Sequence, residues 1–169
     1  AAIAALANPP LGTVPAHSPD FVRDLEDLAA AATYRTRIIR ISTPHNPTGA
    51  VLPRETLERI VELAHEHNAI IVTDEVYEHL VYDGQHVPIA SLPGAFERTL
   101  TISSGGKTFS ATGWKVGWIS GPAELIRAVL AVKQFLTYVN AGPFQHAIAV
   151  GLGFPDVGLV EAAGALAAN

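Results

Sequence analysis

Residues 103–118 read Ser103-Ser104-Gly105-Gly106-Lys107-Thr108-Phe109-Ser110-Ala111-Thr112-Gly113-Trp114-Lys115-Val116-Gly117-Trp118. Lys107 comes just after the strand-like run 99–102 and stands among glycines and hydroxyl-bearing residues, with Lys115 further along. A lysine amine is a nucleophile only in its neutral form, which desolvation or a nearby cation such as Lys115 favours. Glycines permit close backbone approach, and hydroxyls can donate to a phosphate. The segment therefore indicates a reactive lysine beside an anion cradle; the alternative is a Gly/Ser turn with a solvated lysine.

Strands are predicted where short apolar or β-branched runs are bounded by turn residues. These runs are residues 37–42, 69–73, 99–103 and 116–120. Helices are predicted where apolar residues recur at helical spacing, with Pro53 at a first helical position. They cover residues 1–7, 20–32, 53–68, 122–138, 144–152 and 156–169. Strands alternating with helices predict an α/β domain with a mostly parallel sheet and helices on both faces.

Polar residues follow three of the predicted strands. Asn46 lies in the loop after the first, Asp74 ends the nearly continuous apolar run 69–73, and residues 103–107 follow the third. In open α/β sheets, ligands bind outside the carboxyl ends of the strands. We therefore expect these three segments to meet at one edge of the sheet.

Composition excludes several classes of function. A hydrophobic share of 49% in 169 residues indicates a globular domain with a core, and a net charge of −5 without a Lys/Arg cluster argues against nucleic-acid binding. No cysteine is present, which excludes disulfides and thiolate metal sites and is compatible with a cytoplasmic location. The start, residues 1–7, is too short and uncharged for a signal peptide or a membrane span.

Two further patterns resemble a metal-binding motif and a nucleotide-binding motif, but their spacing does not match either one. His65-Glu66-His67 places histidines two apart, on different faces of a helix, so we expect no metal site there. Gly105-Gly106-Lys107-Thr108 lacks the first glycine of a nucleotide-binding P-loop, because Thr101 occupies that position. Trp114 and Trp118 are expected to pack among glycines.

Three motifs occur in a fixed order along the chain. They are Pro44-His45-Asn46-Pro47-Thr48-Gly49, then Thr73-Asp74-Glu75-Val76-Tyr77-Glu78, then the Lys107 segment ending in Gly113-Trp114-Lys115-Val116-Gly117-Trp118. Together they resemble the pyridoxal-phosphate aminotransferases of fold type I (class I/II). The sequence is especially similar to the kynurenine/glutamine transaminase and succinyldiaminopimelate aminotransferase branch. The resemblance implies an enzyme (EC 2.6.1.-) that transfers an amino group between an amino acid and a 2-oxo acid.

The resemblance also implies roles for individual residues. Lys107 is expected to form a Schiff base with pyridoxal 5'-phosphate and to act as the catalytic base. Asp74 is expected to pair with the pyridinium nitrogen, which requires a carboxylate because the protonated ring accepts the substrate's electrons. The alternative for Asp74 is an ordinary cap of the following turn.

The remaining cofactor ligands implied by the family are donors to the ring oxygen and to the phosphate. Asn46 and Tyr77 are expected to donate hydrogen bonds to the 3′-oxygen of the cofactor. The alternative for Tyr77 is that its ring packs in the core while its hydroxyl contacts water. Ser104 and Lys115 match the phosphate ligands. Many relatives have arginine at the latter position, and lysine binds phosphate as a point charge. Residues 138–145 resemble a loop lining the substrate pocket near a dimer interface; the alternative for Tyr138 and Phe144 is a place in the core.

The resemblance covers only the middle of the family's usual length. We therefore expect residues 1–169 to form a partial large domain, with the N-terminal arm and the C-terminal small domain absent. A homodimer is implied for a full-length chain, without nucleic-acid or membrane partners. The substrates implied are N-succinyldiaminopimelate with glutamate, or kynurenine and glutamine-type amino donors. Two alternatives are a pyridoxal-phosphate β-lyase and a truncated non-catalytic domain of the same fold.

Overall fold

The computed structural model describes residues 12–14 and 25–155. The helices predicted over residues 1–7 and 156–169 lie outside the described residues, as does the beginning of the helix predicted from residue 20. The described part of that helix is α2, Leu25–Ala31.

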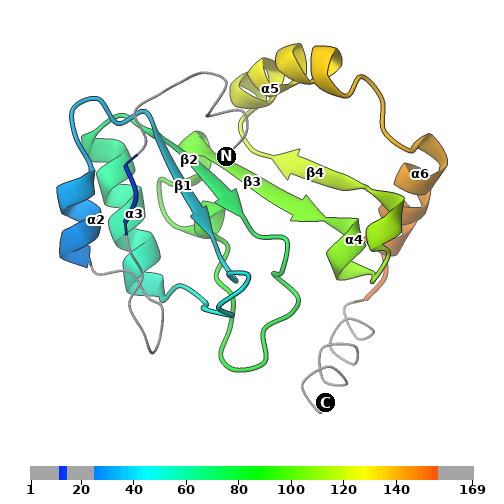
Figure 1. The fold of residues 1–169 in the computed structure, drawn as a ribbon, viewed down its shortest axis with the longest axis horizontal. Coiled ribbons are helices and arrows are strands. Elements are labelled where there is room, and N and C mark those ends of the chain that lie inside the picture. Colours follow the sequence, from blue (N-terminus) through cyan, green and yellow to red (C-terminus); the bar gives the residue numbers. More distant parts are fainter. Residues whose placement is uncertain (1–11, 15–24, 156–169) are drawn as a thin grey trace.

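A four-stranded sheet in the order β1-β2-β3-β4 forms the centre of the molecule (Figure 1). Its strands are β1 Ile38–Ser42, β2 Ile70–Asp74, β3 Thr99–Ser104 and β4 Gly117–Ser120. The first three are parallel, and β4 runs antiparallel to β3. The prediction of an α/β domain with a mostly parallel sheet is confirmed.

Three helices match predicted ones with small shifts at their ends: α3 Arg54–Glu66, α5 Ala123–Leu136 and α6 Gly142–Gly151. The short helix α4 Gly105–Thr108 was not predicted, nor were the 3₁₀ turns η1 Ile89–Ser91, η2 Phe96–Arg98 and η3 Thr112–Trp114. Pro53 is the N-cap of α3 and not its first helical residue. Its fixed φ of −62° suits either position.

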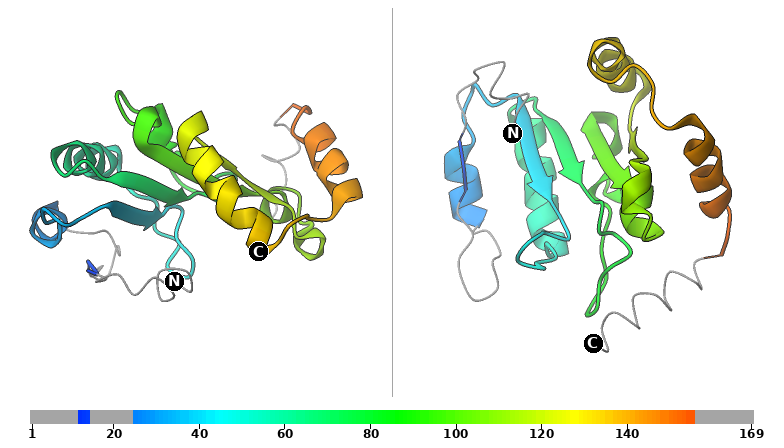
Figure 2. Two further views of the ribbon diagram at one scale, coloured as in Figure 1. Left: turned by 90° about the horizontal axis from the view of Figure 1, so that it is seen from above. Right: turned by 45° about the vertical axis from the view of Figure 1, so that its right-hand side comes forward.

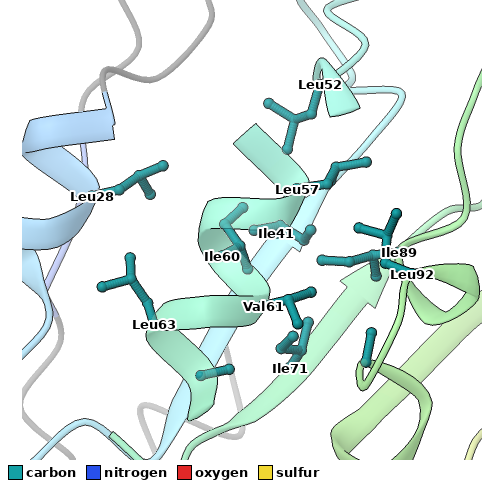
Figure 3. Packing of buried hydrophobic residues seen from close by; sticks show 12 residues of the cluster. Leu28, Ile41, Leu52, Leu57, Ile60, Val61, Leu63, Ile71, Ile89 and Leu92 are labelled. Atoms are coloured by element: carbon teal, nitrogen blue, oxygen red, sulfur yellow. The ribbon is translucent and has the colours of Figure 1, made fainter. Parts of the chain in front are cut away.

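The core lies between α3 and one face of the sheet (Figure 3). The predicted apolar stripe of α3 is buried, and it meets Ile41 of β1 and Ile71 of β2; the stripe consists of Leu57, Ile60, Val61 and Ala64. Each fully buried aliphatic side chain of this size stabilises the fold by about 1.5–3 kcal/mol. Ile71 and Thr73 of β2 are buried, whereas the alternate residues of the strand are only partly buried. Among the described residues, the face of β2 that carries Ile71 and Thr73 is therefore covered more completely than the opposite face.

Helices α5 and α6 lie at the other end of the sheet from α2 and α3 (Figures 1 and 2). None of the residues of α5 is buried, although its sequence has the expected apolar positions. In α6 only Ile148 is buried. No helix in the described part of the chain is both long and apolar enough to cross a membrane.

Candidate functional site

The loop after β1 is held by its own hydrogen bonds and by β2. Within the loop, Gly49 N donates to His45 O at 2.7 Å, and the His45 ring contacts Thr48 Oγ1 at 2.8 Å. At its start, Thr43 N donates to Asp74 O at 3.1 Å. The loop carrying Asn46 is therefore fixed against the carboxyl end of β2.

Tyr77 joins the three segments that follow the parallel strands. Asn46 Nδ2 donates to Tyr77 Oη at 3.1 Å. Lys107 Nζ lies 5.2 Å from the centroid of the Tyr77 ring, within the range of a cation–π contact. The structure thus brings Asn46, Tyr77 and Lys107 together at the edge of the sheet where the parallel strands end.

Asp74 is the last residue of β2 and pairs in register with Ser42 and Ile102. Its Oδ1 is buried and accepts no hydrogen bond from the described residues. Oδ2 lies 3.7 Å from Arg40 Nη2, but the Arg40 side chain is 61% exposed, so water weakens this pair. A cap of the following turn, the alternative for Asp74, is not formed. An unsatisfied buried acceptor is costly, and this one suits a ligand that donates an N–H.

In the Lys107 segment, the side chains of Ser103 and Thr112 donate hydrogen bonds within the protein, whereas those of Ser104 and Lys107 do not. Lys107 Nζ makes no hydrogen bond or ion pair with them, and the Ser104 hydroxyl, at the N-cap of α4, makes no cap hydrogen bond. Ser104 pairs with Gly117, and Gly105 N donates to Val116 O at 3.1 Å. Lys115 lies in the connection between β3 and β4, two residues before β4 begins, and its backbone is left-handed with φ of 55°.

Two glycines of this segment serve packing within the protein. A Cβ on Gly105 would lie 2.7 Å from Ile148 Cδ1, and one on Gly117 would lie 2.8 Å from Ser103 O. Gly113, in contrast, has open space around it. Close backbone approach, predicted for these glycines, is thus observed at Gly105 and Gly117 toward other parts of the chain.

Contacts place other side chains that the sequence analysis singled out. His65 Nε2 contacts Gly94 O at 2.9 Å. Trp114 packs on Phe144, with ring centroids 4.7 Å apart. Tyr138, for which a place in the core was an alternative, is 78% exposed.

Three polar contacts around the site had no role in the sequence predictions. Glu75 is completely buried and contacts His86, Glu78 accepts a hydrogen bond from Ser103 Oγ, and Arg40 approaches Asp74. The signal for Glu75 was its position: a second acidic residue directly after a buried strand requires donors around it.

Fold and geometry together define an α/β domain whose candidate site, with Asn46, Tyr77 and Lys107, lies at the carboxyl edge of its sheet. The model of the family described as "Aminotransferase class I and II" matches residues 2–161. The chain therefore belongs to the class I and II aminotransferase family, which depends on pyridoxal phosphate.

Relatives of known name support this assignment. Over 137 residues the chain is 53% identical to "Probable N-succinyldiaminopimelate aminotransferase DapC" of Mycobacterium tuberculosis, covering 80% of this chain and 34% of that protein. It is 51% identical over 127 residues to human "Kynurenine--oxoglutarate transaminase 1", covering 75% of this chain and 30% of that protein. The chain thus spans about a third of the length of these relatives.

Solved structures show the same fold. The N-succinyldiaminopimelate aminotransferase of Mycobacterium tuberculosis superposes with a TM-score of 0.94 at 47% identity, covering 98% of this chain and 44% of that one. A double mutant of the aspartate aminotransferase of Thermus thermophilus gives a TM-score of 0.76 at 38% identity, covering 85% of this chain and 38% of that one.

Proposed function

We propose that this chain is the cofactor-binding centre of an aminotransferase that moves an amino group between an amino acid and a 2-oxo acid. The observation that carries the proposal is the meeting of Asn46 and Lys107 on Tyr77, next to a strand that ends in Asp74. Residues 1–169 would form part of the large domain of a longer enzyme. The share of the relatives' length that the chain spans supports this division.

The polar groups of the site fit pyridoxal phosphate one by one. The unpartnered Asp74 Oδ1 suits a protonated ring nitrogen. Tyr77 Oη accepts from Asn46 Nδ2, so its own O–H proton is available to the ring oxygen of the ligand. The Ser104 hydroxyl and the Lys115 ammonium group are assigned to the phosphate.

When bound, the cofactor would supply a protonated ring that accepts the electron pair released at the substrate Cα. Lys107 Nζ would hold the cofactor covalently and, when free, would serve as the base for the proton at the substrate Cα. No carboxylate among the described residues forms an ion pair with Lys107. Asp74 Oδ1, which has no partner among those residues, would accept the N–H of the ring nitrogen.

The names of the relatives point to two sets of substrates. We propose N-succinyldiaminopimelate with glutamate, or kynurenine and glutamine-type amino donors, on the strength of the 53% and 51% identities. Incubation of the full-length protein with each amino donor and 2-oxoglutarate measures the transfer through the glutamate formed. Release of pyruvate and ammonia from a cysteine conjugate would instead reveal elimination. We also propose that the full-length protein is a cytoplasmic homodimer. Analytical ultracentrifugation of the full-length protein measures its oligomeric state.

Covalent capture at Lys107 is the test of the proposed site. The protein is mixed with pyridoxal phosphate, its absorption spectrum is recorded, borohydride is added, and the labelled peptide is identified by mass spectrometry. We expect the label on Lys107 and its loss in Lys107→Ala. Lys133, which lies on α5, provides the matched control, because Lys133→Ala should leave both spectrum and labelling unchanged. Identical spectra for wild type and Lys107→Ala would contradict the proposal.

A further inference from the structure

Glu75 is a fully buried carboxylate that the proposed mechanism does not use. It follows Asp74 directly, and its side chain has no exposed surface. Oε1 accepts hydrogen bonds from Thr73 Oγ1 at 3.0 Å and from Ile89 N at 3.3 Å, and Oε2 lies 2.7 Å from His86 Nε2. A buried carboxylate is tolerated where donors surround it. Glu75 has three, so this position is built to hold an acidic side chain.

The contacts of Glu75 close a loop. Its backbone N donates to Ile102 O of β3 at 2.9 Å, which fixes the start of the loop. The loop connects β2 with η1. The Glu75 side chain contacts the other end of this loop, because it bonds to His86 and to Ile89, the first residue of η1. The His86 side chain is 5% exposed, and its Nδ1 is buried without a hydrogen-bond partner among the described residues. Glu75 is therefore the polar partner that holds this ring inside the protein.

Tyr77 lies on this loop between two anchored carboxylates. Glu78 N donates to Glu75 O at 2.9 Å, and Leu80 N donates to Tyr77 O at 2.8 Å, so the backbone around Tyr77 forms tight turns. On the other side of Tyr77, the Glu78 side chain accepts a hydrogen bond from Ser103 Oγ of β3. The ring of Tyr77 is thus presented to Asn46 and Lys107 from a backbone tied to β2, β3 and η1.

We propose that the buried Glu75–His86 pair is a positioning element for Tyr77, which holds the phenol at the cofactor site by closing the loop on which it lies. The inference rests on the proposed function, since it concerns the placement of a residue assigned to the cofactor. Glu75 and His86 do not touch the reacting atoms. They act through the loop that carries Tyr77.

A double-mutant cycle on cofactor affinity tests this role in the full-length protein. The dissociation constant of pyridoxal phosphate is measured by absorption titration for wild type, Tyr77→Phe, Glu75→Ala and the double variant. Tyr77→Phe removes the one hydrogen bond that the hydroxyl would donate to the cofactor, together with the bond it accepts from Asn46, and should weaken binding roughly three- to tenfold. In the Glu75→Ala background the same change should have less than about a twofold effect, because the hydroxyl is already displaced.

Two further variants separate positioning from a general loss of stability. Glu75→Gln keeps an oxygen that can accept from Thr73 and Ile89, so it should bind the cofactor more tightly than Glu75→Ala. Arg98 provides the matched control: its Nη1 donates to Ala64 O at 3.1 Å and Ala69 O at 2.9 Å, at the end of β3 away from Lys107. Arg98→Ala should lower stability while Tyr77→Phe keeps its full effect on affinity in that background.

Each outcome of the cycle decides the inference. An equal loss from Tyr77→Phe in the wild-type and Glu75→Ala backgrounds would overturn it, even if cofactor capture at Lys107 is intact. If Glu75→Ala does not fold, the same cycle is run with His86→Gln, which disturbs one of the three contacts of Glu75. A wild-type protein that fails to capture pyridoxal phosphate at Lys107 would overturn the proposed function and this inference together.

Discussion

The α3 side and the α5–α6 side of the molecule bury their apolar residues to very different degrees. On α3, Leu57, Ile60 and Ala64 have no exposed surface, whereas α5 has no buried residue and Phe135 is 84% exposed. Figure 3 shows the α3 side chains pointing into one cluster with those of β1, β2 and η1. Because burial of apolar side chains stabilises the fold, most of the folding stability of the described residues is expected to come from the α3 side.

The candidate site connects the two sides. Asp74 ends β2 and Tyr77 lies on the loop after it, next to the packed core. Lys107 lies on α4, on the side of the molecule where α6 is found (Figure 1). This segment contacts α6 through Gly105, which lies against the buried Ile148, through Trp114, which stacks on Phe144, and through Phe109, which lies near Gly151. The segment that carries the lysine therefore packs against the more exposed side of the molecule, and the segment that carries the carboxylate lies next to the buried core.

The largest loss of stability is expected at Ile60. Ile60→Ala removes a side chain with no exposed surface from the centre of the α3 cluster. Core truncations of this kind lower the free energy of unfolding by about 2–5 kcal/mol, through lost burial and the cavity left behind. Urea denaturation measures the change. A loss below about 1 kcal/mol would show that the α3 side is not the main source of stability.

A smaller loss is expected where α4 meets α6. Gly105→Ala places a Cβ 2.7 Å from Ile148 Cδ1, so one of the two segments must move. Overpacking of this kind costs about 1–3 kcal/mol. Adding Ile148→Val, which removes the Cδ1 atom, should restore part of the loss in the same urea experiment. If the double variant is no more stable than Gly105→Ala alone, this contact does not set the position of α4.

The smallest effect is expected on α5. Phe135 is 84% exposed, so Phe135→Ala should change the free energy of unfolding by less than about 0.5 kcal/mol. This prediction refers to the chain as the structure describes it. A loss as large as that of Ile60→Ala would mean that another part of the protein covers α5, and the contrast between the two sides would disappear.

Most of the fold could be predicted because its signals are local. The runs in β1, β2 and β3 are short, β-branched and bounded by turn residues, and the stripe Leu57, Ile60 and Ala64 repeats at helical spacing. The apolar positions of α5 predicted its helix as well. They did not predict its exposure, because burial depends on what else packs against a helix and not on its own sequence.

The sequence was sufficient to name the residues of the candidate site, but it did not predict all the side-chain contacts around it. Asn46, Asp74 and Lys107 follow parallel strands, so their meeting at one edge follows from the topology. The Glu75–His86 contact could not be predicted, because it closes a loop whose path the sequence does not specify. The approach of Arg40 to Asp74 likewise depends on the register of β1 against β2.

The most direct test of the central claim, that side chains from three turns surround one cofactor ring, is the protonation state of its nitrogen. Pyridoxal phosphate labelled with ¹⁵N in the ring is bound to the full-length protein and observed by NMR. The ring nitrogen should be protonated in wild type and in Arg40→Ala, and should lose its proton in Asp74→Ala, because Asp74 Oδ1 is then missing. The same ¹⁵N chemical shift in wild type and Asp74→Ala would contradict the account.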